Sequence, residues 1–210
     1  MDEVTPDAAE TERLLRQAQA GDGRAYEQLF GRYRAYLRQV IALRLDPKLR
    51  PRVDPSDVVQ EAELEAFRRL ADYLQRRPMP FRVWLRKTAY ERLLKLRRYH
   101  VETAGRAVGR ELGLADRSSL LLARPLFDRG PSPSQQLARR DLVRRVREAL
   151  AGLAETDREV LLMRNVDELP YREIGCILGL DPAAARKRYG RALLRLRELL
   201  RDTGLLEDHP

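Results

Sequence analysis

Leucine and alanine recur at intervals of three and four residues through most of the chain, and this helical spacing limits its fold more than any other feature. The alternating pattern of a half-buried strand, bounded by turn residues, is absent from the sequence. We therefore predict an all-α protein. Its helices are expected at residues 11–20, 24–45, 54–70 and 81–99, and again from residue 136 onwards.

Turn and capping residues indicate where several of these helices begin. Asp54 can accept a hydrogen bond from the first backbone N–H groups of a helix, and Pro55 fits the first turn, so this pair predicts a helix start. Thr156 and Glu159 have the spacing of a capping box and predict the start of another helix.

Composition changes between residues 101 and 135, where glycine, proline and serine interrupt any long helix. The stretch "GPSPS" at 130–134 is the clearest sign of a linker. We therefore expect two small helical domains joined by a flexible linker, with boundaries at residues 11–100, 101–135 and 136–203.

The charge balance points to an anionic partner. The chain has 41 Lys and Arg against 32 Asp and Glu, a net charge of +9, which is expected of proteins that meet nucleic acid or an anionic membrane surface. The sequence has no apolar run of roughly 20 residues and no signal peptide, so a cytoplasmic location is expected. One cysteine, Cys176, and two histidines offer neither a disulfide framework nor a zinc-ligand pattern, so we expect no metal and no cofactor.

The stretch "LPYREIGCILGLDPAAARKRYGRALLRL" at 169–196 predicts a helix-turn-helix. Gly179 permits a tight turn, and Asp181 with Pro182 caps and opens the second helix. Residues 181–201 carry seven basic residues and two acidic ones. In a DNA-binding helix-turn-helix, arginine can pair with guanine in the major groove and small residues allow a close approach. Alanine is also common in helices that bind nothing, because it is the best helix former, and an arginine-rich face is often only solvated surface. This motif alone therefore favours DNA binding only modestly.

Charge is segregated between two predicted helices of the N-terminal domain. Residues 53–67 contain five acidic residues and no basic one, whereas residues 81–98 contain seven basic residues and one acidic. The acidic helix suits a protein partner with a basic surface, and the basic helix suits nucleic acid. Each helix also has a plainer interpretation, since the acidic residues can form an ordinary solvated face and Trp84 can be a core aromatic.

Four segments in this order resemble a bacterial RNA polymerase sigma factor of the sigma-70 family, extracytoplasmic-function group. They are "GDGRAYEQLFGRY", "DPSDVVQEAELEAF", "FRVWLRKTAYERLLKLRR" and the stretch from "LAGLAETDREVLLMRN" to "ALLRLRELL". The resemblance implies a region 2 helical bundle and a region 4 helix-turn-helix. It also implies a protein that is not an enzyme but binds core polymerase, directs it to promoters and assists their melting.

The resemblance assigns three sets of site residues. The acidic helix would dock on the clamp helices of the largest polymerase subunit through Asp57, Gln60 and Glu61. The minus-ten element would be opened and held by Trp84, Lys87, Arg92, Lys95, Arg98 and Tyr99. The minus-thirty-five element would be read by Arg186, Lys187 and Arg191, with Arg172 on a phosphate. An anti-sigma factor is a further possible partner.

Two other classes of function are weighed against this one. A conventional regulator would use the same helix-turn-helix on duplex DNA, usually as a symmetric dimer, but it would not need the charge segregation of the N-terminal domain. An enzyme acting on nucleic acid is disfavoured because the sequence has no catalytic carboxylate–histidine cluster and no phosphate-binding glycine loop.

Overall fold

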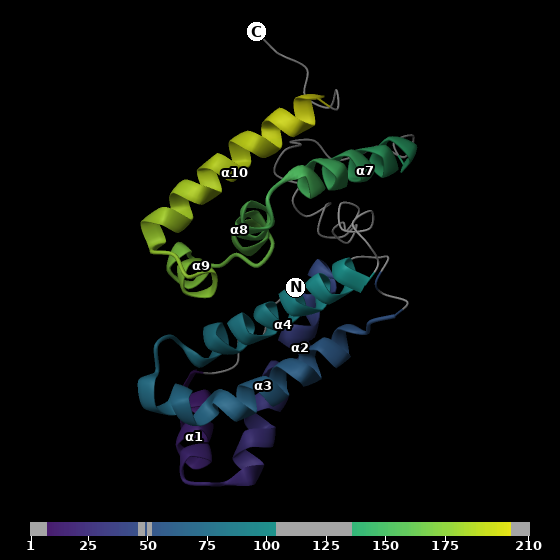
Figure 1. Cartoon of the computed structure of the whole chain (residues 1–210). Coiled ribbons are helices and arrows are strands. Elements are labelled where there is room, and N and C mark those ends of the chain that lie inside the picture. Colours follow the sequence, from purple (N-terminus) through teal and green to yellow (C-terminus); the bar gives the residue numbers. More distant parts are fainter. Residues whose placement is uncertain (1–7, 46–48, 50–51, 104–135, 203–210) are drawn as a thin grey trace. The chain divides into compact units, whose positions relative to one another are not determined.

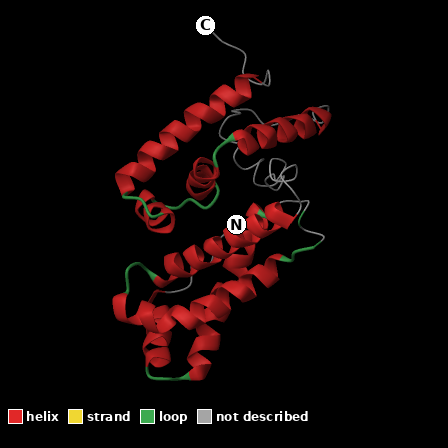
Figure 2. Ribbon diagram, in the orientation of Figure 1, coloured by secondary structure: helices red, strands yellow, loops and turns green. Residues whose placement is uncertain are grey.

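A computed structural model describes residues 8–45, 49, 52–103 and 136–202 of the chain (Figure 1). The regular elements in these ranges are all helices, drawn in red in Figure 2, so the all-α prediction is confirmed. Contacts within the chain divide it into two compact units, one formed by Met1–Ala42 with Val53–Arg97 and the other by Leu43–Arg52 with Arg98–Pro210. The predicted linker falls mostly at residues 104–135, outside the described residues.

The first unit is built from four helices. Their bounds are α1 Ala8–Gln19, α2 Gly23–Arg44, α3 Pro55–Arg76 and α4 Phe81–Thr103, and the last residues of α2 and α4 extend into the second unit. The carboxylate of Asp54 accepts a hydrogen bond from the N–H of Ser56 at 2.7 Å, which confirms the predicted start of α3. This bond from Ser56 also holds the pKa of Asp54 below its ordinary value. At the other end, Arg77 terminates α3 with a left-handed backbone, φ 38°, well beyond the predicted residue 70.

Aromatic rings form much of the core of the first unit. The Trp84 ring lies 4.6 Å from that of Tyr73 and 5.6 Å from that of Phe81, measured between centroids. Tyr33 also packs on Phe81, and its hydroxyl shares a hydrogen bond of 2.9 Å with Thr11 of α1. These contacts tie α1, α2, α3 and α4 to one centre, so the exposed faces of α3 and α4 are held at fixed positions within this unit.

The second unit contains four further labelled helices. These are α7 Gln136–Gly152, α8 Glu155–Asn165, α9 Tyr171–Leu178 and α10 Pro182–Asp202. Helix α10 packs against α7, α8 and α9, and α8 also packs against α9. The side chains that fill this core are fully or almost fully buried: Val146, Leu150, Val160, Leu161, Leu162, Ile174, Ala192, Leu196 and Leu200.

The predicted capping box at Thr156 and Glu159 is wrong. Helix α8 begins one residue before Thr156, and the residue at its cap, Ala154, has no side chain that can accept a hydrogen bond. Glu159 is completely buried, and its carboxylate accepts a hydrogen bond of 2.8 Å from Nε of Arg44, in the short segment that groups with this unit. The glutamate therefore neutralises a buried guanidinium and is not available to cap the helix.

Candidate functional site

The predicted helix-turn-helix is present in α9 and α10. Gly179 ends α9 in the left-handed conformation, φ 69°, and its N–H donates to the carbonyl of Gly175. Asp181 caps α10, because its carboxylate accepts a hydrogen bond of 2.8 Å from the N–H of Ala184. Both local predictions are confirmed, and together these bonds set the turn between the two helices.

Gly175 makes this turn possible, and the sequence reasoning missed it. The N–H of Leu180 donates to the Gly175 carbonyl at 2.9 Å, so the turn folds back over the glycine. A Cβ atom added at Gly175 would lie 2.5 Å from the carbonyl oxygen of Leu180. The available sequence signal was a pair of glycines four residues apart, with Gly175 inside the predicted helix and Gly179 at its predicted end.

Five of the seven cations of α10 fall into two groups. Arg188 and Arg195 pair with the same buried residue, Asp157 of α8, at 3.8 Å and 3.2 Å. Arg186, Lys187 and Arg191 are exposed, and among the described residues none of them forms a hydrogen bond or an ion pair. The three predicted DNA-contacting cations of α10 thus have no ion pair within the described part of the chain, and the exposed Arg197 further along the helix shares this state.

Small residues share the exposed face of α10 with these cations. Ala183 and Gly190 are both exposed, and a Cβ atom added at Gly190 would meet nothing within 4 Å. Leu194 continues the same face one turn later and is 62% exposed, which the sequence reasoning missed. This face of α10 therefore combines long cationic side chains with small residues that project little from the helix. Such a surface can approach a groove of duplex DNA closely.

Helix α9 is oriented against α10 by a polar and aromatic cluster. The Tyr189 hydroxyl bonds to the side-chain oxygen of Asn165 at 2.9 Å, and its ring meets that of Tyr171 edge to face at 5.9 Å. The guanidinium of Arg164 lies 5.1 Å from the centroid of the Tyr171 ring. Arg172, the predicted phosphate contact, is exposed in the first turn of α9 next to this cluster.

Trp84 differs in placement from the other side chains assigned to the minus-ten element. It is only 6% exposed and belongs to the aromatic core described above. The structure therefore gives it the core role that the sequence reasoning weighed beside DNA contact. Tyr73 and Phe81 pack against its ring, so little of the Trp84 side chain is accessible in this conformation.

The remaining side chains of this set lie along one helix, α4. Lys95, Arg98 and Tyr99 are exposed, and Lys87 is half-buried. Arg92 donates from Nε to the carboxylate of Glu61 on α3, and this hydrogen bond raises the pKa of the Arg92 guanidinium. Residues assigned to two different partners, polymerase and DNA, are thus joined in one ion pair.

The exposed face of α3 carries Asp57, Gln60 and Glu61 at helical spacing, as predicted. The same face continues with Leu64 and Phe67, which are each 53% exposed and were missed by the sequence reasoning. The Phe67 ring also meets Tyr26 of α2 edge to face at 5.2 Å. We call these five α3 side chains the α3 stripe; it is polar towards the start of the helix and apolar further along.

Among the described residues, no group of three or more His, Cys, Asp or Glu side chains gathers as metal ligands would. Cys176 is a half-buried free thiol on α9. Among the described helices, none combines the length and apolar content needed to cross a membrane.

Comparisons with known proteins agree on one family. Residues 143–196, which include the second half of α7, all of α8 and α9 and the larger part of α10, match the family model for sigma-70, region 4. Over 188 residues the chain is 32% identical to RNA polymerase sigma factor CnrH of Cupriavidus metallidurans, covering 89% of this chain and 92% of that protein.

One further relative and a solved structure extend this result. The probable RNA polymerase sigma factor RfaY of Xanthomonas campestris pv. campestris is 31% identical over 144 residues, which cover 69% of this chain and 33% of RfaY. A solved structure of CnrH in complex with the cytosolic domain of CnrY is similar with a TM-score of 0.55 and 27% identity, covering 93% of this chain and 99% of that chain.

Proposed function

This chain belongs to the bacterial RNA polymerase sigma factors of the sigma-70 family, in the extracytoplasmic-function group, and we propose on this basis how it acts in transcription initiation. It binds core polymerase in the cytoplasm, directs it to promoters with two separate elements, and assists melting of one of them. Residues 11–100 act as the region 2 domain and residues 136–203 as the region 4 domain, with residues 101–135 as the linker.

Recognition of the minus-thirty-five element rests on one observation, the division of the α10 cations. Arg186, Lys187 and Arg191 are exposed without intramolecular ion pairs among the described residues, whereas Arg188 and Arg195 are held by Asp157. Binding DNA through the first group costs no ion pair within the fold. In the proposed complex this face enters the major groove, and Arg172 contacts a phosphate at its edge.

The minus-ten element is proposed to meet the exposed side of α4. Lys87, Arg92, Lys95 and Arg98 neutralise phosphates, and Tyr99, which is 63% exposed, offers a ring for base stacking. Holding a base outside the stack costs a few kcal/mol, which stacking and phosphate contacts must offset. Trp84 supports α4 from the core, so we assign it positioning of the helix rather than stacking on a base.

Core polymerase is proposed to dock on the α3 stripe. Asp57, Gln60 and Glu61 supply polar contacts, while Leu64 and Phe67 supply apolar area beside them. Exposed apolar side chains next to polar ones suit a protein interface, whereas DNA phosphates would be repelled by the carboxylates. Because CnrH has been solved with the cytosolic domain of CnrY, we also propose that an anti-sigma protein of that kind restrains this chain.

An open-complex assay tests the proposal as a whole. Purified bacterial core polymerase is mixed with a library of promoter fragments, with and without this protein, and unpaired thymines are detected by permanganate. Melting that requires both protein and core, on fragments sharing two spaced elements, is the expected result. Specific duplex binding without core, and no melting with core, would instead identify a conventional regulator.

A pair of variants tests the α10 assignment in the same assay. Arg186→Ala should lose discrimination at one position of the minus-thirty-five element, since a base contact is sequence-specific. Arg195→Ala is the matched control on the same helix: it breaks the pair with Asp157 and should leave base preference unchanged. Equal weakening on all promoter sequences by Arg186→Ala would reduce this residue to a phosphate contact.

A further inference from the structure

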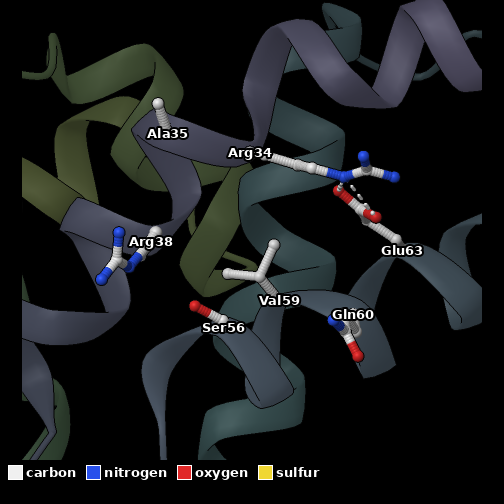
Figure 3. Close-up of a pocket in the computed structure, with 7 residues that line it drawn as sticks. All are labelled: Arg34, Ala35, Arg38, Ser56, Val59, Gln60 and Glu63. Atoms are coloured by element: carbon white, nitrogen blue, oxygen red, sulfur yellow. Dashed lines mark hydrogen bonds and ion pairs between the residues drawn. The ribbon is translucent and has the colours of Figure 1, made fainter.

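A groove of about 480 Å³ runs between α2 and α3 of the first unit (Figure 3). One wall comes from α2 and the other from the first turns of α3, and the lining residues are Arg34, Ala35, Arg38, Ser56, Val59, Gln60 and Glu63. Gln60 belongs to both the groove and the α3 stripe, so the groove borders directly on the proposed polymerase-docking surface.

The two arginines of the groove are in different electrostatic states. Nε of Arg34 donates to both carboxylate oxygens of Glu63, at 2.9 Å and 3.0 Å, and in Figure 3 its guanidinium is directed toward that residue. The guanidinium of Arg38 is turned away from this pair. Within the described residues Arg38 makes no hydrogen bond or ion pair, although it lies near enough to Asp54 to help lower the pKa of that carboxyl.

Arg38 also has no evident role in holding the fold together. It is exposed, and the packing of this part of α2 is carried by the buried side chains of Leu37 and Ile41. An uncommitted guanidinium offers several donors in a planar fork that matches a carboxylate or a phosphate. Because no described residue uses these donors, they are available to a group outside the unit.

We propose that Arg38 binds a carboxylate on the same polymerase segment that docks on the α3 stripe. This inference rests on the proposed function, and it adds the chemistry of the partner. The partner segment presents basic or polar groups to Asp57 and Glu61 and an acidic side chain to Arg38, with Gln60 between the two contacts. The docking surface thus spans α2 as well as α3, and its mixed charge fixes the register of the partner.

A protein carboxylate fits this groove better than a DNA phosphate. Asp54, Asp57, Glu61 and Glu63 all belong to the first part of α3 or to its cap, and Glu63 lines the groove itself. A DNA strand carries a phosphate at every nucleotide and would meet these carboxylates as well as Arg38. A protein segment can place one acidic side chain at Arg38 and groups of the opposite sign beside it.

The test measures association of the full chain with purified core polymerase in the absence of DNA, at several salt concentrations. Arg38→Ala should weaken association roughly twofold to fivefold at low salt, and Arg38→Glu should weaken it further. The difference from the wild type should shrink as salt rises, because the contact is exposed to solvent. Arg32→Ala and Arg32→Glu are the matched controls, since Arg32 is an exposed arginine of the same helix that does not line the groove.

The outcomes separate this inference from the function on which it rests. If the wild type binds core and Asp57→Lys does not, while the Arg38 variants bind like the wild type, the inference is overturned and the docking function stands. If the wild type itself fails to bind core, the proposed function fails first. If the Arg38 variants keep their core affinity but weaken binding of the assembled complex to promoter DNA, the groove binds phosphate and the carboxylate assignment is wrong.

Discussion

Replacing Gly175 by alanine should damage the helix-turn-helix even though alanine is the better helix former. The added Cβ would lie 2.5 Å from the carbonyl oxygen of Leu180 and 3.4 Å from two backbone carbonyl carbons. The turn cannot easily move away, because the N–H groups of Gly179 and Leu180 both donate to the Gly175 carbonyl. The neighbouring atoms are backbone rather than the end of a flexible side chain, so relief requires α9 and α10 to separate.

The expected size of the effect follows from two opposing contributions. Overpacking a close contact costs about 1–3 kcal/mol, and the change from glycine to alanine in a helix returns up to about 1 kcal/mol. Because this backbone contact is so short, the overpacking cost should lie near the upper end of its range. The net loss of folding stability is then about 1–2 kcal/mol. Gly190→Ala is the control, since its Cβ meets nothing within 4 Å and should stabilise α10 by about 0.5–1 kcal/mol.

Both variants can be measured in the full chain. Chemical denaturation followed by circular dichroism reports all helices, while fluorescence of the single tryptophan, Trp84, reports the first unit. Amide hydrogen exchange of peptides from α9 and α10 then locates the change. Gly175→Ala should speed exchange in these two helices and leave the Trp84 transition unchanged. If α9 and α10 of the Gly175→Ala variant exchange their amide hydrogens at the wild-type rate, the steric argument is refuted.

Two further predictions concern titration and helix capping. Burial raises the pKa of Tyr73 from about 10 to about 12, so the folded state holds this proton more tightly than the unfolded state. The resulting stability, about 3 kcal/mol at most, is present below pH 10 and is lost as the pH rises towards 12. The alkaline dependence of the unfolding free energy should therefore be flatter in Tyr73→Phe. Asp181→Ala should cost about 1 kcal/mol in denaturant unfolding because it removes the acceptor for the Ala184 N–H, whereas Asp181→Asn should be nearly neutral.

The features predicted well from sequence are those decided by a few neighbouring residues. Asp54 and Asp181 cap helices because their carboxylates need to reach only two or three residues along the chain. Gly179 ends α9 because a left-handed residue at that point favours glycine. The capping box failed for a complementary reason. Glu159 has the correct local spacing, but a distant partner, Arg44, and complete burial give its carboxylate another use.

The state of each charged side chain could not be read from the sequence. Arg186 and Arg188 are two residues apart in the same stretch of sequence. Among the described residues only Arg188 has a carboxylate within reach, that of Asp157, which lies 31 positions earlier in the sequence on α8. Arg34 and Arg38 show the same contrast on α2. Helical periodicity predicts which face a residue occupies, but the partner on the adjoining helix decides whether its charge remains available.

The ion pair between Glu61 and Arg92 connects the two surfaces that we assign to polymerase and to DNA. When polymerase engages Glu61, Arg92 loses its counter-charge and is released to a phosphate, so occupation of one surface favours occupation of the other. Both side chains are partly exposed, and an ion pair of this kind is worth about 1 kcal/mol or less. The coupling through this pair is therefore limited to about fivefold. Dependence of DNA binding on core polymerase beyond that factor must come from elsewhere in the assembly, because Arg186, Lys187 and Arg191 have no ion pair to break among the described residues.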